Sequence, residues 1–187
     1  MNKTTTYISD KELLDRCEEG SDQGYAILYD RYAKGVFNTI YRLVADLHTT
    51  EDILQEVFID LFRDIGRLKR LENLGAWANR VAINKSISEL RKNRMFFVEI
   101  GDHEPQDTSE NDLSEKVGLE AKIGELAEAI QELSPQARTI VNLYLFEDMS
   151  QEEIARMLDI SHVAVRSQYH RAKIRIAQNM NKRRNHG

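Results

Sequence analysis

Cysteine and proline are scarce in this chain, and each scarcity excludes a class of protein. The single cysteine, Cys17, cannot form a disulfide within the chain or supply a thiolate metal cluster, so a disulfide-rich scaffold is excluded. Two prolines and nine glycines in 187 residues leave few helix breakers, which favours helix throughout. No apolar run approaches the roughly 18–20 residues that a membrane-spanning helix needs.

The N-terminal residues lack an apolar run after Lys3, so we expect no secretory signal. Together with the single cysteine, this predicts a protein of the reducing cytoplasm.

Histidines and carboxylates do not form a recognisable catalytic or metal-binding pattern. Five histidines are spread along the chain, and none shares a helical face with two carboxylates at the spacing of zinc ligands. Cys17 has no histidine near it in sequence, and there is no glycine-rich phosphate loop. We therefore expect no enzymatic activity, no cofactor and no bound metal, while a site assembled in space from distant residues stays open.

Charge is distributed unevenly, although the net charge of −5 argues against indiscriminate binding to nucleic acid. Residues 99–128 contain ten acidic and two basic side chains, whereas 160–187 contain seven basic and no acidic ones. Residues 67–94 carry eight basic groups against two acidic ones, and they follow an acidic segment at 46–64. Each run could be a solvated face, but two basic segments beside helical patterns favour contacts with phosphates.

Apolar residues at helical spacing predict helices along the first half of the chain. Ser9 and Glu12 have the spacing of a capping box for a first helix. Thr49 is predicted to cap a third helix, with Asp52 at its third position. After the first helix, the predicted elements are helices at 22–46, 49–65 and 76–94, with a loop at 66–75.

Composition changes at about residue 98, which predicts two domains. The stretch 98–114 is polar, acidic and poor in apolar residues, so we expect a flexible linker there. Helix is expected to restart near Leu113. The predicted fold class is all-α, with small helical domains at 1–97 and 115–187.

The segment from Ser150 has the pattern of a helix-turn-helix, preceded by a helix that begins at Ser134-Pro135. Ser150 and Glu153 have capping-box spacing, Asp159-Ile160 forms the predicted turn, and Ser161 caps the second helix. The predicted inner face of that second helix is Val165, Tyr169, Ala172 and Ile176. The opposite face carries Arg166, Ser167, His170, Arg171, Lys173 and Arg175. An apolar stripe opposite cations and donors is what a helix needs to read base edges and phosphates, so we expect duplex DNA binding.

The segment 67–94 combines basic residues with an aromatic and an amide side chain. Its cations include Arg67, Lys69, Arg70, Arg80, Lys85 and Arg91, and its other candidates are Trp77 and Asn84. Cations follow a nucleic-acid backbone, aromatic faces stack on bases, and amides read the edge of an unstacked base. This pattern predicts binding to single-stranded DNA, although Trp77 also fits a place in the core.

Three segments in this order resemble the bacterial sigma factors of the extracytoplasmic-function group. The first, TTEDILQEVFIDLF, is similar to that family's polymerase-binding helix. The second, AWANRVAINKSISELRKNR, resembles its promoter-melting and minus-ten segment. The third, LSPQARTIVNLYLFEDMSQEEIARMLDISHVAVRSQYHRAKIRI, resembles its minus-thirty-five domain.

The resemblance implies a role for each segment. It implies that core RNA polymerase is bound, through its beta-prime clamp, by Asp52, Gln55, Glu56 and Phe58. It implies that the melted minus-ten strand is bound by Arg67, Lys69, Arg70, Trp77, Arg80, Asn84, Lys85 and Arg91. It implies that the minus-thirty-five duplex is read by Ser161, His162, Arg166, Ser167, His170, Arg171 and Arg175. The implied function is promoter-specific transcription initiation, in a stress or envelope response, with the beta flap and an anti-sigma factor as further partners.

The recognition helix departs from the family's common pattern. The family often has glycine and threonine at the positions of Val163 and Ala164, a basic residue at Gln168 and leucine at Tyr169. These positions lie in or beside the DNA-reading helix, so the promoter sequence does not transfer from the family.

Two other classes stay open besides an enzyme. One is a helix-turn-helix regulator that binds DNA without polymerase and uses 1–98 for sensing or dimerisation. The other is a purely structural interaction protein, which would leave the basic C-terminal segment unused. Dependence of promoter binding on core polymerase separates a sigma factor from a regulator.

Overall fold

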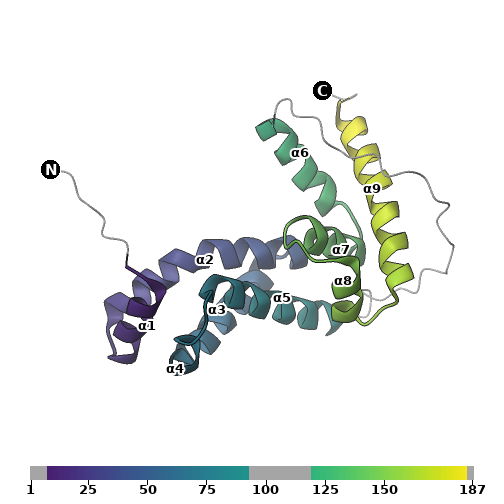
Figure 1. Cartoon of the computed structure of the whole chain (residues 1–187). Coiled ribbons are helices and arrows are strands. Elements are labelled where there is room, and N and C mark those ends of the chain that lie inside the picture. The colour runs from purple at the N-terminus through teal and green to yellow at the C-terminus, as the bar shows by residue number, and fades with distance from the viewer. Residues whose placement is uncertain (1–7, 93–118, 185–187) are drawn as a thin grey trace. The chain divides into compact units, whose positions relative to one another are not determined.

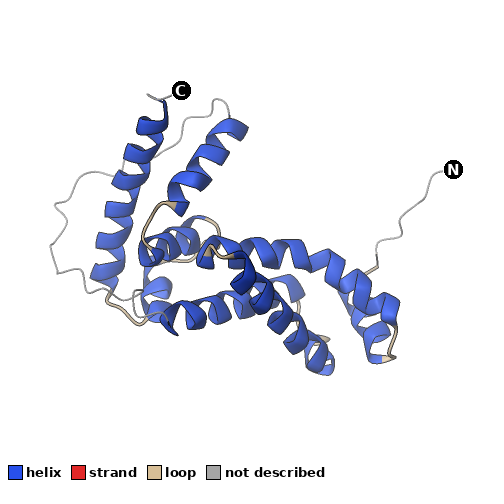
Figure 2. Cartoon of the chain, turned by 180° about the vertical axis from the view of Figure 1, so that it is seen from behind, coloured by secondary structure: helices blue, strands red, loops and turns tan. Residues whose placement is uncertain are grey.

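The computed structural model describes residues 8–92 and 119–184. The chain divides into two compact units, Met1–Glu89 and Leu90–Gly187. Throughout the described residues the only regular secondary structure is helix, which confirms the expected all-α class (Figure 1 and Figure 2). The expected linker at 98–114 and the helix restart near Leu113 lie outside the described residues.

The first unit is a small helical domain in which α2 packs against both α1 and α3. Its helices are α1 (Asp10–Glu18), α2 (Asp22–Val44), α3 (Leu47–Arg63), α4 (Ile65–Leu68) and α5 (Leu74–Lys92). The residues buried in its core include Leu13, Leu14, Leu28, Ile40, Leu43, Val57, Leu61, Ala78, Ala82 and Ile87. Burying one such aliphatic side chain contributes about 1.5–3 kcal/mol, so packing of these apolar faces determines how the helices lie.

The start of α3 differs from the sequence-based prediction. Thr49 was the predicted N-cap, but the cap is Asp46, whose carboxylate accepts hydrogen bonds from the Thr49 backbone N–H at 2.8 Å and from the Thr49 hydroxyl at 2.6 Å. Ala45, just before Asp46, has a left-handed backbone with φ of 54° and is the C-cap of α2, whose last helical residue is Val44. An aspartate offers a stronger acceptor than threonine, and α3 therefore begins two residues early, at Leu47.

The segment predicted as a loop at 66–75 is more structured than expected. The short helix α4 covers Ile65–Leu68, and α5 begins at Leu74 rather than Ala76. The side chain of Asn73 accepts a hydrogen bond from the Ala76 backbone N–H at 2.9 Å, which satisfies a donor in the first turn of α5. The remaining loop between α4 and α5 is therefore short.

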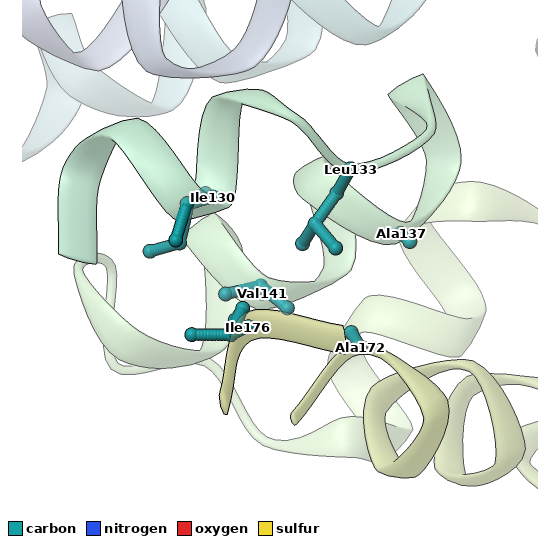
Figure 3. Packing of buried hydrophobic residues seen from close by; sticks show 7 residues of the cluster. Ile130, Leu133, Ala137, Val141, Ala172 and Ile176 are labelled. Atoms are coloured by element: carbon teal, nitrogen blue, oxygen red, sulfur yellow. The ribbon is translucent and has the colours of Figure 1, made fainter. Parts of the chain in front are cut away.

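The second unit contains four described helices around a separate apolar core. They are α6 (Leu119–Gln131), α7 (Pro135–Leu145), α8 (Gln151–Leu158) and α9 (His162–Arg184). Figure 3 shows how side chains from α6, α7 and α9 meet in this core, whose buried members are Ala129, Ile130, Leu133, Ala137, Val141, Ala172 and Ile176. Tyr169 packs against the cluster from a partly buried position. The predicted inner face of α9 is confirmed, since Val165 is fully buried as well.

Caps and turn of the helix-turn-helix also follow the prediction. Ser150 and Glu153 form a complete capping box at the start of α8. Asp159 ends α8 with a left-handed backbone, φ 57°, and the Ser161 hydroxyl accepts from the Ala164 backbone N–H at 3.1 Å at the start of α9. Pro135 lies in the first turn of α7 as predicted, but Ser134 makes no side-chain capping hydrogen bond there.

None of the helices in the described part of the chain has the length and apolar character needed to cross a membrane.

The Asp46 cap predicts a pH-dependent contribution to stability. Hydrogen bonds from the Thr49 side chain and backbone lower the pKa of Asp46. Because the pKa is lower in the folded state, the stabilisation is present above about pH 4, the ordinary range of aspartate, and is lost as pH falls through the folded value. Urea unfolding followed by fluorescence of Trp77, the single tryptophan, reports on the first unit.

The comparison variant is Asp46→Asn, whose amide does not titrate. We expect the difference in urea midpoint between wild type and Asp46→Asn to shrink as pH falls from about 6 to about 3. Thr49→Val, which removes the hydroxyl donor, should weaken this pH dependence. A difference that stays constant over that range would contradict the capping role of the Asp46 carboxylate.

Candidate nucleic-acid and protein interfaces

Helix α3 separates an apolar face from an acidic one. Its buried residues include Ile53, Leu54, Val57, Phe58 and Leu61. The exposed side carries Glu51, Asp52, Gln55, Glu56 and Ile59. These exposed positions recur three and four residues apart and therefore form one ridge along the helix. We call them the acidic ridge of α3.

His48 lies at the start of this ridge and interacts with it. Its Nδ1 is 3.0 Å from a carboxylate oxygen of Asp52, one helical turn away. The backbone hydrogen bond of His48 and then the charge of Asp52 raise the pKa of the imidazole. Protonation of His48 would therefore neutralise part of the negative charge of the ridge.

Phe58 does not lie on the acidic ridge, although it was among the residues expected to bind polymerase. Its side chain is 3% exposed, and its ring lies 4.6 Å from that of Tyr29 and 5.8 Å from that of Phe62, measured between centroids. A ring buried to this extent offers little surface to a partner, so in the free chain Phe58 is part of the core. The neighbouring Ile59 is 52% exposed instead, and its position three residues after Glu56 is a sequence signal that could have identified it.

Most candidates for single-strand binding on α5 share one helical stripe. Arg80, Asn84 and Arg91 are exposed and Trp77 is half-buried. They follow one another at intervals of three, four and seven residues, which brings their side chains to the same side of the helix. We call these four residues the α5 stripe. Its two arginines, amide and indole ring are suited to phosphates and unstacked bases.

The Lys69 ammonium forms ion pairs with carboxylates of the protein, whereas other cations of its segment extend into solvent. Its Nζ lies 2.6 Å from an Asp15 carboxylate oxygen and also forms an ion pair with Glu18, both on α1. Hydrogen bonds to these two carboxylates raise the pKa of Lys69. The Lys69 ammonium therefore ties the loop after α4 to α1, whereas Arg67 and Arg70 on either side are exposed.

A pocket of about 250 Å³ adjoins this loop in the first unit. Asp10, Lys11 and Leu14 of α1 form one wall, and the other wall comes from Leu68, Lys69, Leu71, Glu72 and Leu74. Both charged and apolar side chains line it, so it can offer a ligand hydrogen bonds together with apolar contacts.

Lys85 likewise points away from the α5 stripe. It follows Asn84 by one residue and is therefore rotated by about 100° around the helix axis. Its Nζ lies 3.0 Å from a Glu56 carboxylate oxygen and 3.0 Å from an Asp60 carboxylate oxygen, both on α3. Burial alone would lower the pKa of Lys85, but hydrogen bonds to Glu56 and Asp60 outweigh it and raise the pKa.

In the second unit, most predicted duplex-reading residues are accessible on α9. Ser161, His162, Arg166 and Arg175 are exposed, and His170 and Arg171 are partly buried. Ser167 is only 7% exposed, so its hydroxyl does not lie on an open surface as the sequence pattern had suggested. The exposed cations and donors nevertheless follow α9 from its first turn.

A depression of about 670 Å³ lies where α8 and α9 begin. Its lining includes Ser150, which is the N-cap of α8, Gln151 and Glu152 of α8, and His162 and Arg166 of α9. His162 Nε2 is 3.5 Å from a Glu152 carboxylate oxygen, which links the two helices of the motif across this depression. Arg166 lines the same depression, so a guanidinium, an imidazole and a carboxylate there offer donors and acceptors of the kind that can pair with base edges.

Among the described residues, no group of histidine, cysteine, aspartate or glutamate side chains could hold a metal ion.

Comparison with known families finds one match in the helical region before residue 96 and one in the region that contains the helix-turn-helix. The family model described as Sigma-70 region 2 matches residues 28–95, and the model described as Sigma-70, region 4 matches residues 123–176. These are two regions of one family, in the order in which the acidic ridge and the helix-turn-helix occur here. The chain belongs to the sigma-70 family, in its extracytoplasmic-function group.

Curated sigma factors match most of the chain. The ECF RNA polymerase sigma factor BldN of Streptomyces coelicolor is 28% identical over 164 residues, which cover 86% of this chain and 62% of BldN. The RNA polymerase sigma-H factor of Pseudomonas aeruginosa is 28% identical over 182 residues, covering 90% of this chain and 92% of that protein. The chain thus spans less than two thirds of BldN but nearly the whole of the sigma-H factor.

Solved structures share the fold of this sigma factor. CnrH, in complex with the cytosolic domain of CnrY, has a TM-score of 0.50 and 17% identity, covering 92% of this chain and 97% of CnrH. The sigma factor RpoE from Bartonella quintana, in complex with the anti-sigma factor NepR, has a TM-score of 0.50 and 18% identity, covering 84% and 96%. At this identity the likeness concerns the fold alone.

The contrast between Phe58 and Ile59 predicts unequal effects of neighbouring substitutions on the stability of this sigma factor. Phe58→Ala should lower the free energy of unfolding of the first unit by about 3–5 kcal/mol, because it leaves a cavity among aromatic rings. Ile59→Ala should change it by about 0.5 kcal/mol or less, as for other surface positions. Urea unfolding followed by Trp77 fluorescence measures both. Equal losses would contradict the placement of Phe58 in the core.

Proposed function

We propose that the chain binds core RNA polymerase and directs promoter-specific initiation of transcription, in a stress or envelope response. The observation that carries this proposal is the succession of three surfaces along one chain. The acidic ridge of α3 comes first, the α5 stripe follows, and the exposed basic residues of α9 come last. A regulator that works without polymerase has no evident use for the first of these surfaces.

The acidic ridge is proposed to dock on the beta-prime clamp of polymerase. Asp52, Gln55 and Glu56 are exposed on it, and negative charge of this density suits a basic partner surface. Ile59 adds an exposed aliphatic side chain at the same face. An apolar contact surrounded by charged groups is a common arrangement at protein interfaces, because water is excluded from the contact. We therefore propose that Ile59, rather than Phe58, belongs to the docking surface.

The α5 stripe and the loop after α4 are proposed to bind the melted minus-ten strand. Arg80 and Arg91 would contact the backbone, Trp77 would stack on a base, and Asn84 would read a base edge. Arg67 and Arg70 are exposed on α4 and the loop after it and would add phosphate contacts. We propose the pocket of about 250 Å³ beside this loop as the place of a flipped base. Lys69, which is paired with Asp15 and Glu18, would support the loop and form part of the wall of this pocket.

The second unit is proposed to read the minus-thirty-five duplex and to contact the beta flap. His162, Arg166 and Arg175 are exposed on α9, and an arginine can bind a guanine edge through two hydrogen bonds. Exposed cations would add sequence-independent attraction to phosphates. The domain limits proposed for these roles are 1–97 and 115–187, with 98–114 as the connection.

An anti-sigma factor and a cytoplasmic location complete the proposal. RpoE is held by an anti-sigma factor in its solved structure, and we propose a partner of this kind for the present chain as well. Bacterial RNA polymerase works in the cytoplasm, so the chain would act there. It would act by binding alone, with RNA synthesis catalysed by polymerase, and we propose no cofactor.

Removing two polar side chains from the acidic ridge tests the docking surface. Asp52→Ala with Gln55→Ala should weaken binding to purified core polymerase by about tenfold or more, as loss of interface hot spots does. The matched control is Asp22→Ala with Gln23→Ala, which removes the same two exposed residue types from the first turn of α2. Far-UV circular dichroism should show unchanged helix in both. Equal loss of polymerase affinity in the two double variants would contradict the proposed surface.

A further inference from the structure

Lys85 is held on α3 by two carboxylates and is not directed along the α5 stripe. The Lys85 side chain retains 26% of its exposure, whereas Glu56 retains 60% and Asp60 36%. Glu56 and Asp60 are one helical turn apart, so both oxygens reach the same ammonium at 3.0 Å. The positive charge of Lys85 is therefore paired with carboxylates of the protein, although Lys85 is the residue next to Asn84 of the α5 stripe.

One of the two carboxylates belongs to the acidic ridge as well. Glu56 can pair with Lys85 or with a cation of a bound partner, and full engagement with one weakens its interaction with the other. If a partner takes Glu56, Lys85 is left with Asp60, whose carboxylate also faces Arg63 at 3.8 Å. A lysine has a flexible four-carbon stem, so its ammonium can then move to another acceptor.

We propose that Asp60 is a positioning residue, which together with Glu56 holds the Lys85 ammonium on α3 in the free protein. When Glu56 docks on a cationic surface of polymerase, Lys85 is released and can bind a phosphate of the melted strand. This inference rests on the proposed function, since it links the docking surface to the strand-binding surface. By linkage, binding of the strand to Lys85 strengthens docking through Glu56 by the same factor. Free protein thus binds single-stranded DNA with one cation fewer than polymerase-bound protein.

Asp60→Asn should release Lys85 without polymerase. The full chain is titrated onto a fluorescein-labelled single-stranded DNA oligonucleotide of random sequence, and binding is followed by fluorescence anisotropy over a range of salt concentrations. We expect Asp60→Asn to bind about threefold to fivefold more tightly near ~0.1 M salt and to steepen the logarithmic salt dependence by about 0.7, the value of one additional phosphate contact. Glu51→Gln, the matched control, removes the same charge from the α3 surface without touching Lys85.

Two variants of Lys85 separate this coupling from a general charge effect. Lys85→Met in the Asp60→Asn background should abolish the gain, whereas Lys85→Arg should retain it. The single variant Asp60→Glu should bind the oligonucleotide as tightly as the wild-type chain does, because it keeps a carboxylate. Equal gains in Asp60→Asn and Glu51→Gln, a gain that survives Lys85→Met, or no measurable gain at all would each overturn the proposal.

Addition of core polymerase distinguishes failure of the coupling from failure of the proposed function. With polymerase present, wild type and Asp60→Asn should bind the strand equally, since docking has already released Lys85. If wild type binds polymerase and initiates transcription but Asp60→Asn shows no gain as a free chain, only the coupling is wrong. If wild type does not bind polymerase at all, the proposed function is wrong.

Discussion

Burial of the apolar face of α3 against the rest of the first unit is the constraint on which its other features depend. Leu61 and Val57 are fully buried, and the aromatic ring of Phe58 packs between those of Tyr29 and Phe62. Once this face is buried, the rotation of the helix is determined, and Asp52, Gln55 and Glu56 must face outward. The acidic ridge is thus a consequence of packing on the opposite side, and a substitution that disturbs the core would move the docking surface too.

The basic residues between α3 and the end of α5 divide into two groups with different tasks. Lys69 and Lys85 form ion pairs with carboxylates of α1 and α3, respectively. Arg67, Arg80 and Arg91 are exposed. Lys69 and Lys85 thus connect elements within the unit, while the guanidinium groups of Arg67 and Arg80 lie on the surface, where a phosphate can reach them. This division suits their chemistry, because the planar guanidinium can bind a phosphate through two parallel hydrogen bonds.

Much of this arrangement could be predicted from the sequence. The inner face of α9 and the caps at Ser150 and Ser161 follow from helical spacing and from local capping chemistry, which depend on near neighbours only. The cap of α3 was misassigned, because Asp46 and Thr49 are both good capping residues and their competition is decided by the turn at Ala45. Sequence order alone does not reveal a left-handed backbone at an alanine.

Other errors arose where the spatial partner is distant in the chain. The resemblance implies that Phe58 belongs to the docking surface, and only its packing against Tyr29 on α2 shows that its ring is buried. The charge count of 67–94 could not show that Lys69 and Lys85 are already paired, because Asp15 and Glu56 lie 54 and 29 residues away, respectively. Burial of Ser167 likewise has no signature in the helical pattern of α9.

Run-off transcription tests the central claim most directly. The purified chain and bacterial core RNA polymerase are combined on a pool of promoter fragments from the genome that encodes the chain. The account predicts discrete transcripts that require both components, and their start sites would define the two recognised promoter elements. It would be contradicted if the chain failed to bind polymerase but bound specific duplex DNA alone, as a helix-turn-helix regulator does.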